Sequence, residues 1–205
     1  MSRTAIVAAC LIVLALVAGC SDDPEPALPA VPETASAIAI EARTFTNGAF
    51  VRPRFTCDGV NLSPEIGWSG APNGVQSLAI ILNDPDAPGG SYIHWLVYGI
   101  PPTVTRVGEA EGKAVETIAS GGSQALNTPG DLGFAGPCPP RGESHRYELH
   151  VYALDRELEL PPLTPRAEVI RAMDGSVVGH GVLTARYQRI EREDENVVFK
   201  VTPTP

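Results

Sequence analysis

Three segments of the chain have apolar patterns that predict β-strands. Residues Ser77–Asn83 are apolar on both faces, which is typical of a central strand covered on both sides. A second apolar run, His94–Ile100, ends at Pro101 and Pro102. The third segment, His145–Leu154, alternates between two faces as a half-buried strand does. One face carries His145, Tyr147, Leu149, Val151 and Ala153, and the other carries Arg146, Glu148, His150 and Tyr152.

The rest of the chain gives weaker structural signals. Thr164 can cap a helix that has Pro165 at its first position and runs to about Met173. The segment Val182–Ile190 is compatible with a strand or a helix. Residues 103–144 hold much glycine and proline and few long apolar runs. A stretch of that length without regular structure is usually functional or disordered.

Composition supports a β-rich fold. The chain has 205 residues, enough for one sizeable domain, and its 20 glycines and 20 prolines favour strands joined by turns and long loops. We therefore expect a mainly β protein with a few helices. The formal net charge of −9 argues against nucleic acid as a partner and against electrostatic docking on anionic lipid. Net charge does not exclude a single cationic pocket.

The first residues are typical of an export signal. Arg3 precedes an apolar run that is too short for a stable membrane-spanning helix, so we interpret residues 1–19 as a signal peptide. The run ends in Val17-Ala18-Gly19-Cys20, which resembles a bacterial lipobox and implies cleavage before an acylated Cys20. The protein would then be anchored to the cell membrane by lipid, on its extracytoplasmic side. The alternative is an ordinary secretory signal, with Cys20 incidental.

Domain boundaries follow from composition. Residues 20–37 contain four prolines, several acids and few large apolar groups, so we expect a lipidated cysteine followed by an extended tether. The folded domain is expected over residues 38–192, and residues 193–205 form a C-terminal tail.

Two cysteines remain after the export signal. Cys57 and Cys138 would both lie in an oxidising compartment, where a pair of cysteines tends to be bridged. We favour a disulfide between them over the alternative of two buried free thiols.

Four ordered sequence blocks resemble a known family. They are Asp84-Pro85-Asp86-Ala87-Pro88, His94-Trp95-Leu96-Val97-Tyr98, Gly136-Pro137-Cys138-Pro139-Pro140-Arg141-Gly142 and His145-Arg146-Tyr147. Together they look like the signature of the phosphatidylethanolamine-binding family, most closely its bacterial, Raf kinase inhibitor-like branch. The resemblance covers roughly residues 40–190. It implies a large central antiparallel sheet packed against a smaller sheet, and a small pocket for phosphate-type or phosphoethanolamine-type anions.

The resemblance also implies which residues line that pocket. They are Asp84, Asp86, His94, Pro140, His145 and Tyr147, of which Asp86 is more often a support of the loop. Two positions depart from the pattern. Ile93 stands where bacterial relatives often have an aromatic residue, so one pocket wall is expected to be smaller. Tyr187 is left out because the C-terminal helix of animal relatives has no clear counterpart here.

Physical chemistry supports a pocket for an anion or a zwitterion. His145 and Tyr147 lie two residues apart on a strand and share a face, and both side chains can donate hydrogen bonds to a phosphate. An ionised aspartate can instead accept from a ligand ammonium or hold a histidine in its charged form. The alternatives are that Asp84 and Asp86 only cap a turn, and that His94 and His145 are core histidines.

Motifs for catalysis are missing from the sequence. There is no Gly-x-Ser-x-Gly elbow, no P-loop and no Cys-x-x-Cys pair, and His145 and His150 face opposite sides of their strand. His180 stands isolated among glycines. We therefore expect no metal, no cofactor and no enzymatic activity. A binding module is favoured over a protein-interaction or inhibitor module of unknown partner, and over a hydrolase.

Overall fold

The computed structural model describes residues 27–191, which form two sheets and one α-helix. Residues 1–26 and 192–205 lie outside the described part, and with them the predicted signal peptide, Cys20, most of the tether and the C-terminal tail. The strands are β1 (Ser36–Ala37), β2 (Ala39–Glu41), β3 (Ile66–Ser69), β4 (Ser77–Asp84), β5 (Tyr92–Ile100), β6 (Arg106–Val107), β7 (Ser123–Gln124), β8 (Ser144–Leu154) and β9 (Val177–Gln188). The helices are the 3-10 helix η1 (Pro53–Phe55) and α1 (Arg166–Met173).

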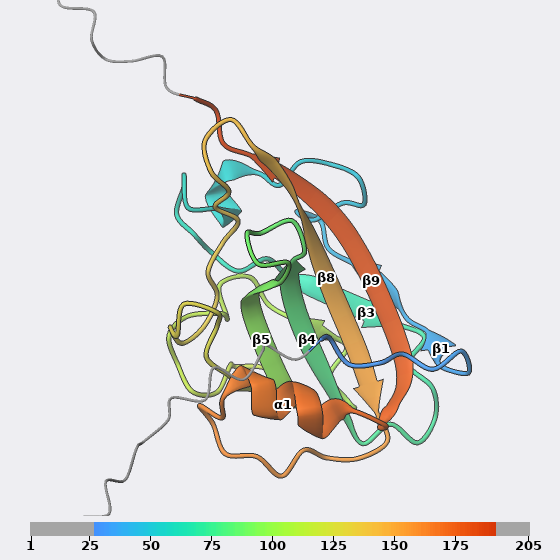
Figure 1. Ribbon diagram of the computed structural model, residues 1–205. Coiled ribbons are helices and arrows are strands. Elements are labelled where there is room, and N and C mark those ends of the chain that lie inside the picture. Colours follow the sequence, from blue (N-terminus) through green and yellow to red (C-terminus); the bar gives the residue numbers. More distant parts are fainter. Residues whose placement is uncertain (1–26, 192–205) are drawn as a thin grey trace, which may run out of the picture.

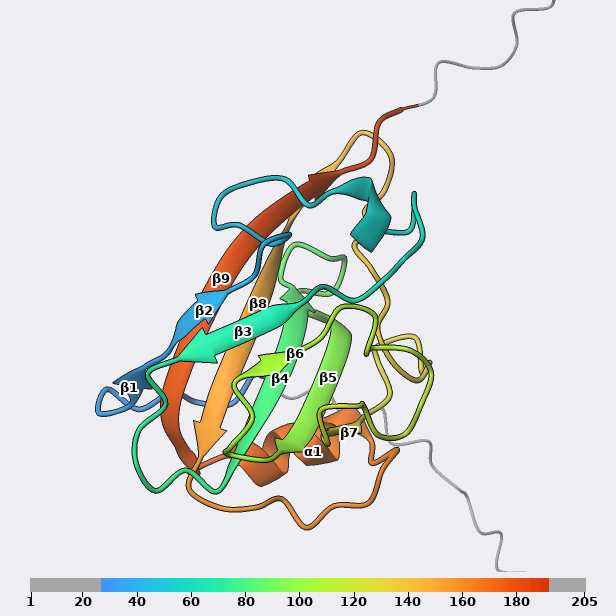
Figure 2. The same cartoon turned by 180° about the vertical axis from the view of Figure 1, so that it is seen from behind.

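The large sheet has the strand order β1-β9-β8-β4-β5-β7, and the small sheet has the order β2-β3-β6. All neighbouring strands are antiparallel except β1 and β9, which are parallel. The expected combination of a large and a smaller sheet is confirmed, and the parallel edge strand makes the large sheet mixed. Figure 1 shows α1 in front of this sheet, and Figure 2 shows the small sheet on its other face.

This three-layer arrangement explains why β4 is apolar on both faces. All eight residues of β4 are buried. Leu78, Ile80 and Leu82 belong to the core between the two sheets, and Ala79 and Ile81 belong to the core beneath α1. Successive side chains of a strand point to opposite faces, so a strand between two covering layers must be apolar throughout.

Strand β8 has the alternation that its sequence predicts. Tyr147, Leu149 and Val151 are buried in the core between the sheets, whereas Tyr152 faces the α1 side. Strand β9 settles the segment that the sequence left open, because residues 177–188 pair with β8 along its whole length.

The predicted helix is present, but its predicted cap is wrong. Helix α1 begins after Pro165 and buries Val169, Ile170 and Met173 against the large sheet. Thr164 does not cap it, because the Thr164 hydroxyl donates instead to the carbonyl of Pro161 at 2.7 Å.

Part of the predicted tether packs on the domain. Leu28 contacts the core on the α1 side, Pro29 is buried, and Ser36–Ala37 pair with β9. Figure 1 shows this first described segment crossing the large sheet on the same side as α1. No helix within residues 27–191 is long and apolar enough to cross a membrane.

Polar side chains organise the long loop region between β5 and β8. Gln124 is fully buried, accepts a hydrogen bond from the Trp95 indole at 2.6 Å and donates to the carbonyl of Lys113 at 2.8 Å. Asn127 accepts from the backbone N–H of Asp131 at 2.8 Å. These hydrogen bonds replace the apolar runs that the loop lacks, and they place its second half over one end of the large sheet.

Candidate functional site

A cavity of about 530 Å³ opens at the end of β4. Because β4 lies between β8 and β5 and is antiparallel to both, its last residue meets the first residues of each neighbour. Asp84 ends β4, His94 lies near the start of β5, and His145 lies near the start of β8. The sheet thus brings together three predicted site residues that are far apart in the sequence, and all three line the cavity.

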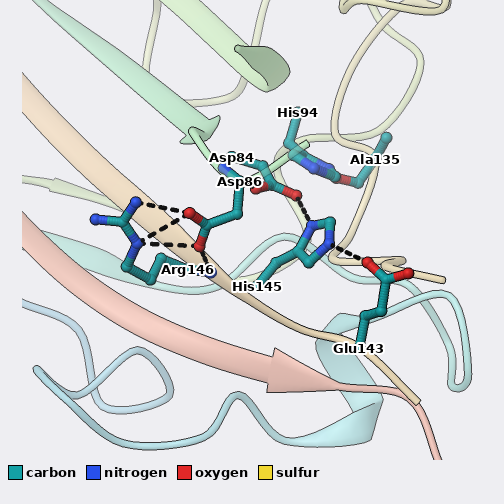
Figure 3. Close-up of polar contacts among 7 residues, drawn as sticks. All are labelled: Asp84, Asp86, His94, Ala135, Glu143, His145 and Arg146. Atoms are coloured by element: carbon teal, nitrogen blue, oxygen red, sulfur yellow. Dashed lines mark hydrogen bonds and ion pairs between the residues drawn. The ribbon is translucent and has the colours of Figure 1, made fainter. Parts of the chain in front are cut away.

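Asp84 and His145 form a buried pair at the cavity. The His145 Nδ1 lies 2.7 Å from the Asp84 Oδ2, and the two side chains are only 6% and 5% exposed (Figure 3). On its other side, the His145 Nε2 lies 3.4 Å from a carboxylate oxygen of Glu143. Burial alone would lower the pKa of His145, but the hydrogen bond and charge of Asp84, with a smaller effect of Glu143, raise it above its usual value. His145 is therefore held toward its charged form.

Asp84 also shapes the loop that follows β4. Its Oδ1 accepts a hydrogen bond from the backbone N–H of Asp86 at 2.9 Å, as aspartate does in a turn. Asp84 therefore caps the turn with Oδ1, as one alternative predicted, and contacts His145 at the cavity with Oδ2.

His94 is held in the opposite charge state. Its Nδ1 lies 2.7 Å from the carbonyl oxygen of Ala135, so Nδ1 carries the proton and donates (Figure 3). Burial lowers the pKa of His94 below the usual value, which favours the neutral ring. A neutral ring with a protonated Nδ1 leaves Nε2 as a hydrogen-bond acceptor.

A β-bulge decides which aromatic residue stands beside His94. Leu82 pairs with Trp95 and the next residue, Asn83, pairs with Ile93, so β5 has one extra residue, His94, at this point. A bulge turns the following side chains to the other face. Ile93 is consequently buried in the core beneath α1 rather than in a cavity wall, and the expectation of a smaller wall at Ile93 is wrong. Tyr92 lines the cavity instead, with its ring 4.6 Å from that of His94.

Asp86 is not among the residues that line the cavity, and its contacts fit the expected support of the loop. Its carboxylate accepts from the Arg146 guanidinium, with Nη2–Oδ1 at 2.6 Å and Nε–Oδ2 at 3.0 Å, and from the Arg146 backbone N–H at 2.8 Å. This pairing lowers the pKa of Asp86 to about 2. The pair ties the loop after β4 to β8, on the side away from His145 (Figure 3).

Tyr147 lies behind the cavity rather than in its wall. Its side chain is fully buried, and its ring meets the ring of His94 edge-on with centroids 5.3 Å apart. Its hydroxyl has no hydrogen-bond partner among the described residues. Tyr147 thus packs against His94 and is not among the residues that line the cavity.

The Pro-rich segment before β8 forms one rim of the cavity. Pro140 is exposed at this rim, as predicted, and Cys138 beside it forms a disulfide with Cys57, with Cα atoms 5.4 Å apart. Gly136 also lines the cavity, and a Cβ there would lie 2.5 Å from the carbonyl oxygen of Phe55. A side chain at this position would therefore displace the backbone of η1.

Sequence reasoning missed four polar residues of the cavity, namely Asn61, Tyr92, Asp131 and Arg189. Asp131 comes from the long loop, where the Asn127 side chain holds its backbone. Arg189 follows β9 and pairs with Asp58 at 3.1 Å. None of the four lies in a signature block. Arg189 reaches the cavity because the chain continues past the end of β9, where Arg189 bridges to Arg141.

The cavity combines acceptors and donors without a metal-binding group. Asp84 and Asp131 can accept hydrogen bonds, whereas charged His145 and Arg189 offer positive charge. Within residues 27–191, no three histidine, cysteine or carboxylate side chains are grouped so that they could hold a metal ion. The arrangement is chemically suited to a ligand with a cationic and an anionic end.

Comparison with known proteins agrees with this fold. The family model for the phosphatidylethanolamine-binding protein matches residues 41–188. A UPF0098 protein of Methanothermobacter thermautotrophicus is 40% identical over 150 residues, which are 73% of this chain and 98% of that protein. A Mycobacterium tuberculosis protein named "Putative lipoprotein LppC" is 30% identical over 203 residues, 92% of this chain and 98% of that one.

A solved structure shows the same architecture. The crystal structure of E. coli YbcL, described as a new member of the mammalian PEBP family, superposes with a TM-score of 0.69 at 31% identity. The match covers 74% of this chain and 98% of the YbcL chain. The chain belongs to the phosphatidylethanolamine-binding protein family.

Proposed function

We propose that this protein is an exported binding protein that holds a phosphate-type or phosphoethanolamine-type ligand in the cavity at the end of β4. The buried pair of Asp84 and His145 is the observation that carries the proposal. A histidine held charged beside a carboxylate presents both signs of charge at one place, and family membership supports a ligand with a phosphoethanolamine head group.

Such a ligand can be placed by its charges. Its ammonium group would donate to the carboxylates of Asp84 and Asp131, and its phosphate would lie toward Arg189 and the Nε2 of His145. Free phosphate would use only the second set. The proposal is binding rather than hydrolysis, because the two cavity cysteines are bonded to each other and no serine or threonine is among the described residues that line the cavity.

We also propose that the domain is held at the cell membrane, on the extracytoplasmic side, by a lipid on Cys20. The lipobox-like sequence and the similarity to the relative named a lipoprotein support this placement. Metabolic labelling with a fatty acid should mark the wild-type protein and not the Cys20→Ala variant. Equal labelling of both would contradict the anchor and leave the binding proposal unaffected.

Isothermal calorimetry tests the binding proposal. We expect the soluble chain from Ser21, which omits the lipidated Cys20, to bind phosphoethanolamine. The His145→Ala variant should bind at least about tenfold more weakly, since a hydrogen bond to a charged group contributes roughly 1.5–3 kcal/mol. The matched control is His180→Ala, which removes a histidine from the opposite face of the sheet. No binding of phosphate or phosphoethanolamine, or equal loss in both variants, would refute the proposal.

A further inference from the structure

A second cavity of about 490 Å³ lies beside the first, along the end of β9. Its apolar lining residues are Phe50, Val51, Pro53 and Ile190, and Tyr187 also lines it. Two isolated backbone bridges flank the end of β9: Arg186 pairs with Phe50, and Arg189 pairs with Arg141. We call this second cavity the side groove.

The side groove and the first cavity share a wall. Neighbouring residues of the chain line different cavities at this wall. Cys57 and Pro140 line the first cavity, whereas the residues that follow them, Asp58 and Arg141, line the side groove. The teal η1 and the red end of β9 lie at the same end of the molecule in both overall views (Figures 1 and 2). The two cavities are therefore neighbours, and a ligand that occupies both would have to cross this wall.

Charges at the crossing are already paired. The Arg189 guanidinium donates to Asp58, with Nη2–Oδ1 at 3.1 Å, and the Tyr187 hydroxyl donates to the other oxygen at 2.8 Å. These hydrogen bonds hold the pKa of Asp58 below its usual value. Arg141 donates to the carbonyl of Ile190 at 3.0 Å. Glu191 is the remaining charged residue of the lining, and it is exposed.

The apolar side chains of the groove face water to an unusual degree. Phe50 is 62% exposed and Ile190 is 84% exposed, although both are large hydrophobic residues. Single exposed apolar residues are common, but here two of them line the same concave surface beside a ligand cavity. The groove thus offers apolar contact next to a charged site.

We infer that the ligand is a single-chain amphiphile, whose phosphorylated head occupies the first cavity and whose acyl chain lies in the side groove. This inference rests on the proposed function and narrows its ligand class. The order of groups along the two cavities matches such a molecule. The carboxylates of Asp84 and Asp131 lie in the first cavity, Arg189 lies at the shared wall, and the apolar side chains lie in the side groove. A head-only ligand would leave Phe50 and Ile190 exposed.

The test compares ligands that share one head and differ in chain length. Binding of glycerophosphoethanolamine and of lysophosphatidylethanolamines with increasingly long saturated chains is measured by calorimetry, each below the concentration at which it forms micelles. Burying one methylene contributes about 0.8 kcal/mol, so affinity should rise by up to about fourfold for each methylene added until the groove is filled.

Variants assign that gain to the groove. In Phe50→Ser combined with Ile190→Ser, the gain with chain length should fall sharply, while affinity for glycerophosphoethanolamine stays unchanged. Both residues are exposed, so the fold should tolerate the change. The matched control, Val182→Ser, removes an apolar side chain that is 51% exposed on β9 outside the groove, and it should keep the full gain.

Two results would overturn the inference and leave the proposed function in place. One is head-group binding with no gain from longer chains, as expected for a soluble phosphate compound or for a groove that binds a protein or a second copy of this chain. The other is an unchanged gain in the Phe50/Ile190 double variant. If glycerophosphoethanolamine does not bind at all, the proposed function fails and the inference with it.

Discussion

Glu143 contacts the ring nitrogen of His145 that the proposed anion would use. Its side chain is 60% exposed, and its oxygen lies 3.4 Å from the His145 Nε2, a long contact compared with the 2.7 Å contact of Asp84. Exposed ion pairs contribute little, about 0.2–1 kcal/mol, so a phosphate oxygen can replace Glu143 at low cost. Asp84 orients the histidine, and Glu143 occupies the donor that a ligand would use.

Replacing Glu143 by glutamine should therefore strengthen anion binding. We expect Glu143→Gln to raise phosphate affinity about two- to fivefold at neutral pH, because the variant removes both a competitor and a repelling charge. Calorimetry with inorganic phosphate measures this gain. Glu159→Gln, which changes an exposed carboxylate in the loop after β8, serves as the control and should have wild-type affinity. Unchanged or weaker binding in Glu143→Gln would contradict this role.

At the scale of elements, β8 carries two histidines on opposite faces of the sheet. His145 contacts Asp84 at the cavity. His150 lies on the face of the sheet that α1 covers, where its Nδ1 is 3.0 Å from the Nε2 of His180 on β9. The rings of Tyr152 and His180 pack around His150, and Glu148 lies 3.5 Å from its Nε2. Although glycines flank His180 in the sequence, strand pairing places its ring against His150 and Tyr152.

This second pair should make the protein sensitive to acid. Burial, with a smaller effect of the nearby His180, lowers the pKa of His150 to about 4, compared with about 6.5 in an unfolded chain. The free energy of unfolding is therefore highest above pH 6.5 and decreases as the pH falls toward 4, because in that range His150 takes up a proton only in the unfolded chain. The loss should total roughly 3 kcal/mol.

The unfolding free energy of the His150→Phe variant, measured by denaturant titration at several pH values, should fall less steeply between pH 6.5 and 4. Tyr152→Phe is the matched control, because it alters the adjacent ring and leaves His150 able to titrate. Identical slopes for wild type and His150→Phe would show that His150 does not cause the acid sensitivity.

Much of the fold was predictable from the sequence. The apolar pattern of Ser77–Asn83 and the alternation of His145–Leu154 follow from two-sided and one-sided burial, and both became central strands. Other features depend on geometry that no local pattern encodes. Only Asp84 of the two aspartates lines the cavity, and the partner that holds Asp86 in the loop is Arg146, sixty residues away in sequence.

The bulge in β5 is a second such case. It cannot be identified from apolar periodicity. It places Ile93 in the core beneath α1 and leaves Tyr92 at the cavity beside His94. Arg189 was missed for a related reason. Its place at the cavity depends on how far β9 extends and on the pairing with Asp58, neither of which a signature block records.

The whole molecule combines a rigid frame with a site at one end. The two sheets enclose one core, and α1 covers a second core on the other face of the large sheet. Together these layers fix the ends of β4, β5 and β8, which carry Asp84, His94 and His145. The disulfide joins positions 81 residues apart and ties the Pro-rich rim to the segment after η1. Closing a loop of that length stabilises a fold by roughly 4 kcal/mol in the chain-entropy model.

This frame divides the four histidines of the chain into two pairs on opposite faces, so a single NMR experiment can test the binding proposal directly. Imidazole signals of all four residues are recorded over a pH titration, with and without phosphoethanolamine. We predict that His145 titrates above 6.5 and His94 below it, and that the ligand moves the signals of these two while those of His150 and His180 stay in place. Ligand-induced changes at His150 and His180 instead, or at none of the four, would contradict the assignment of this cavity as the binding site.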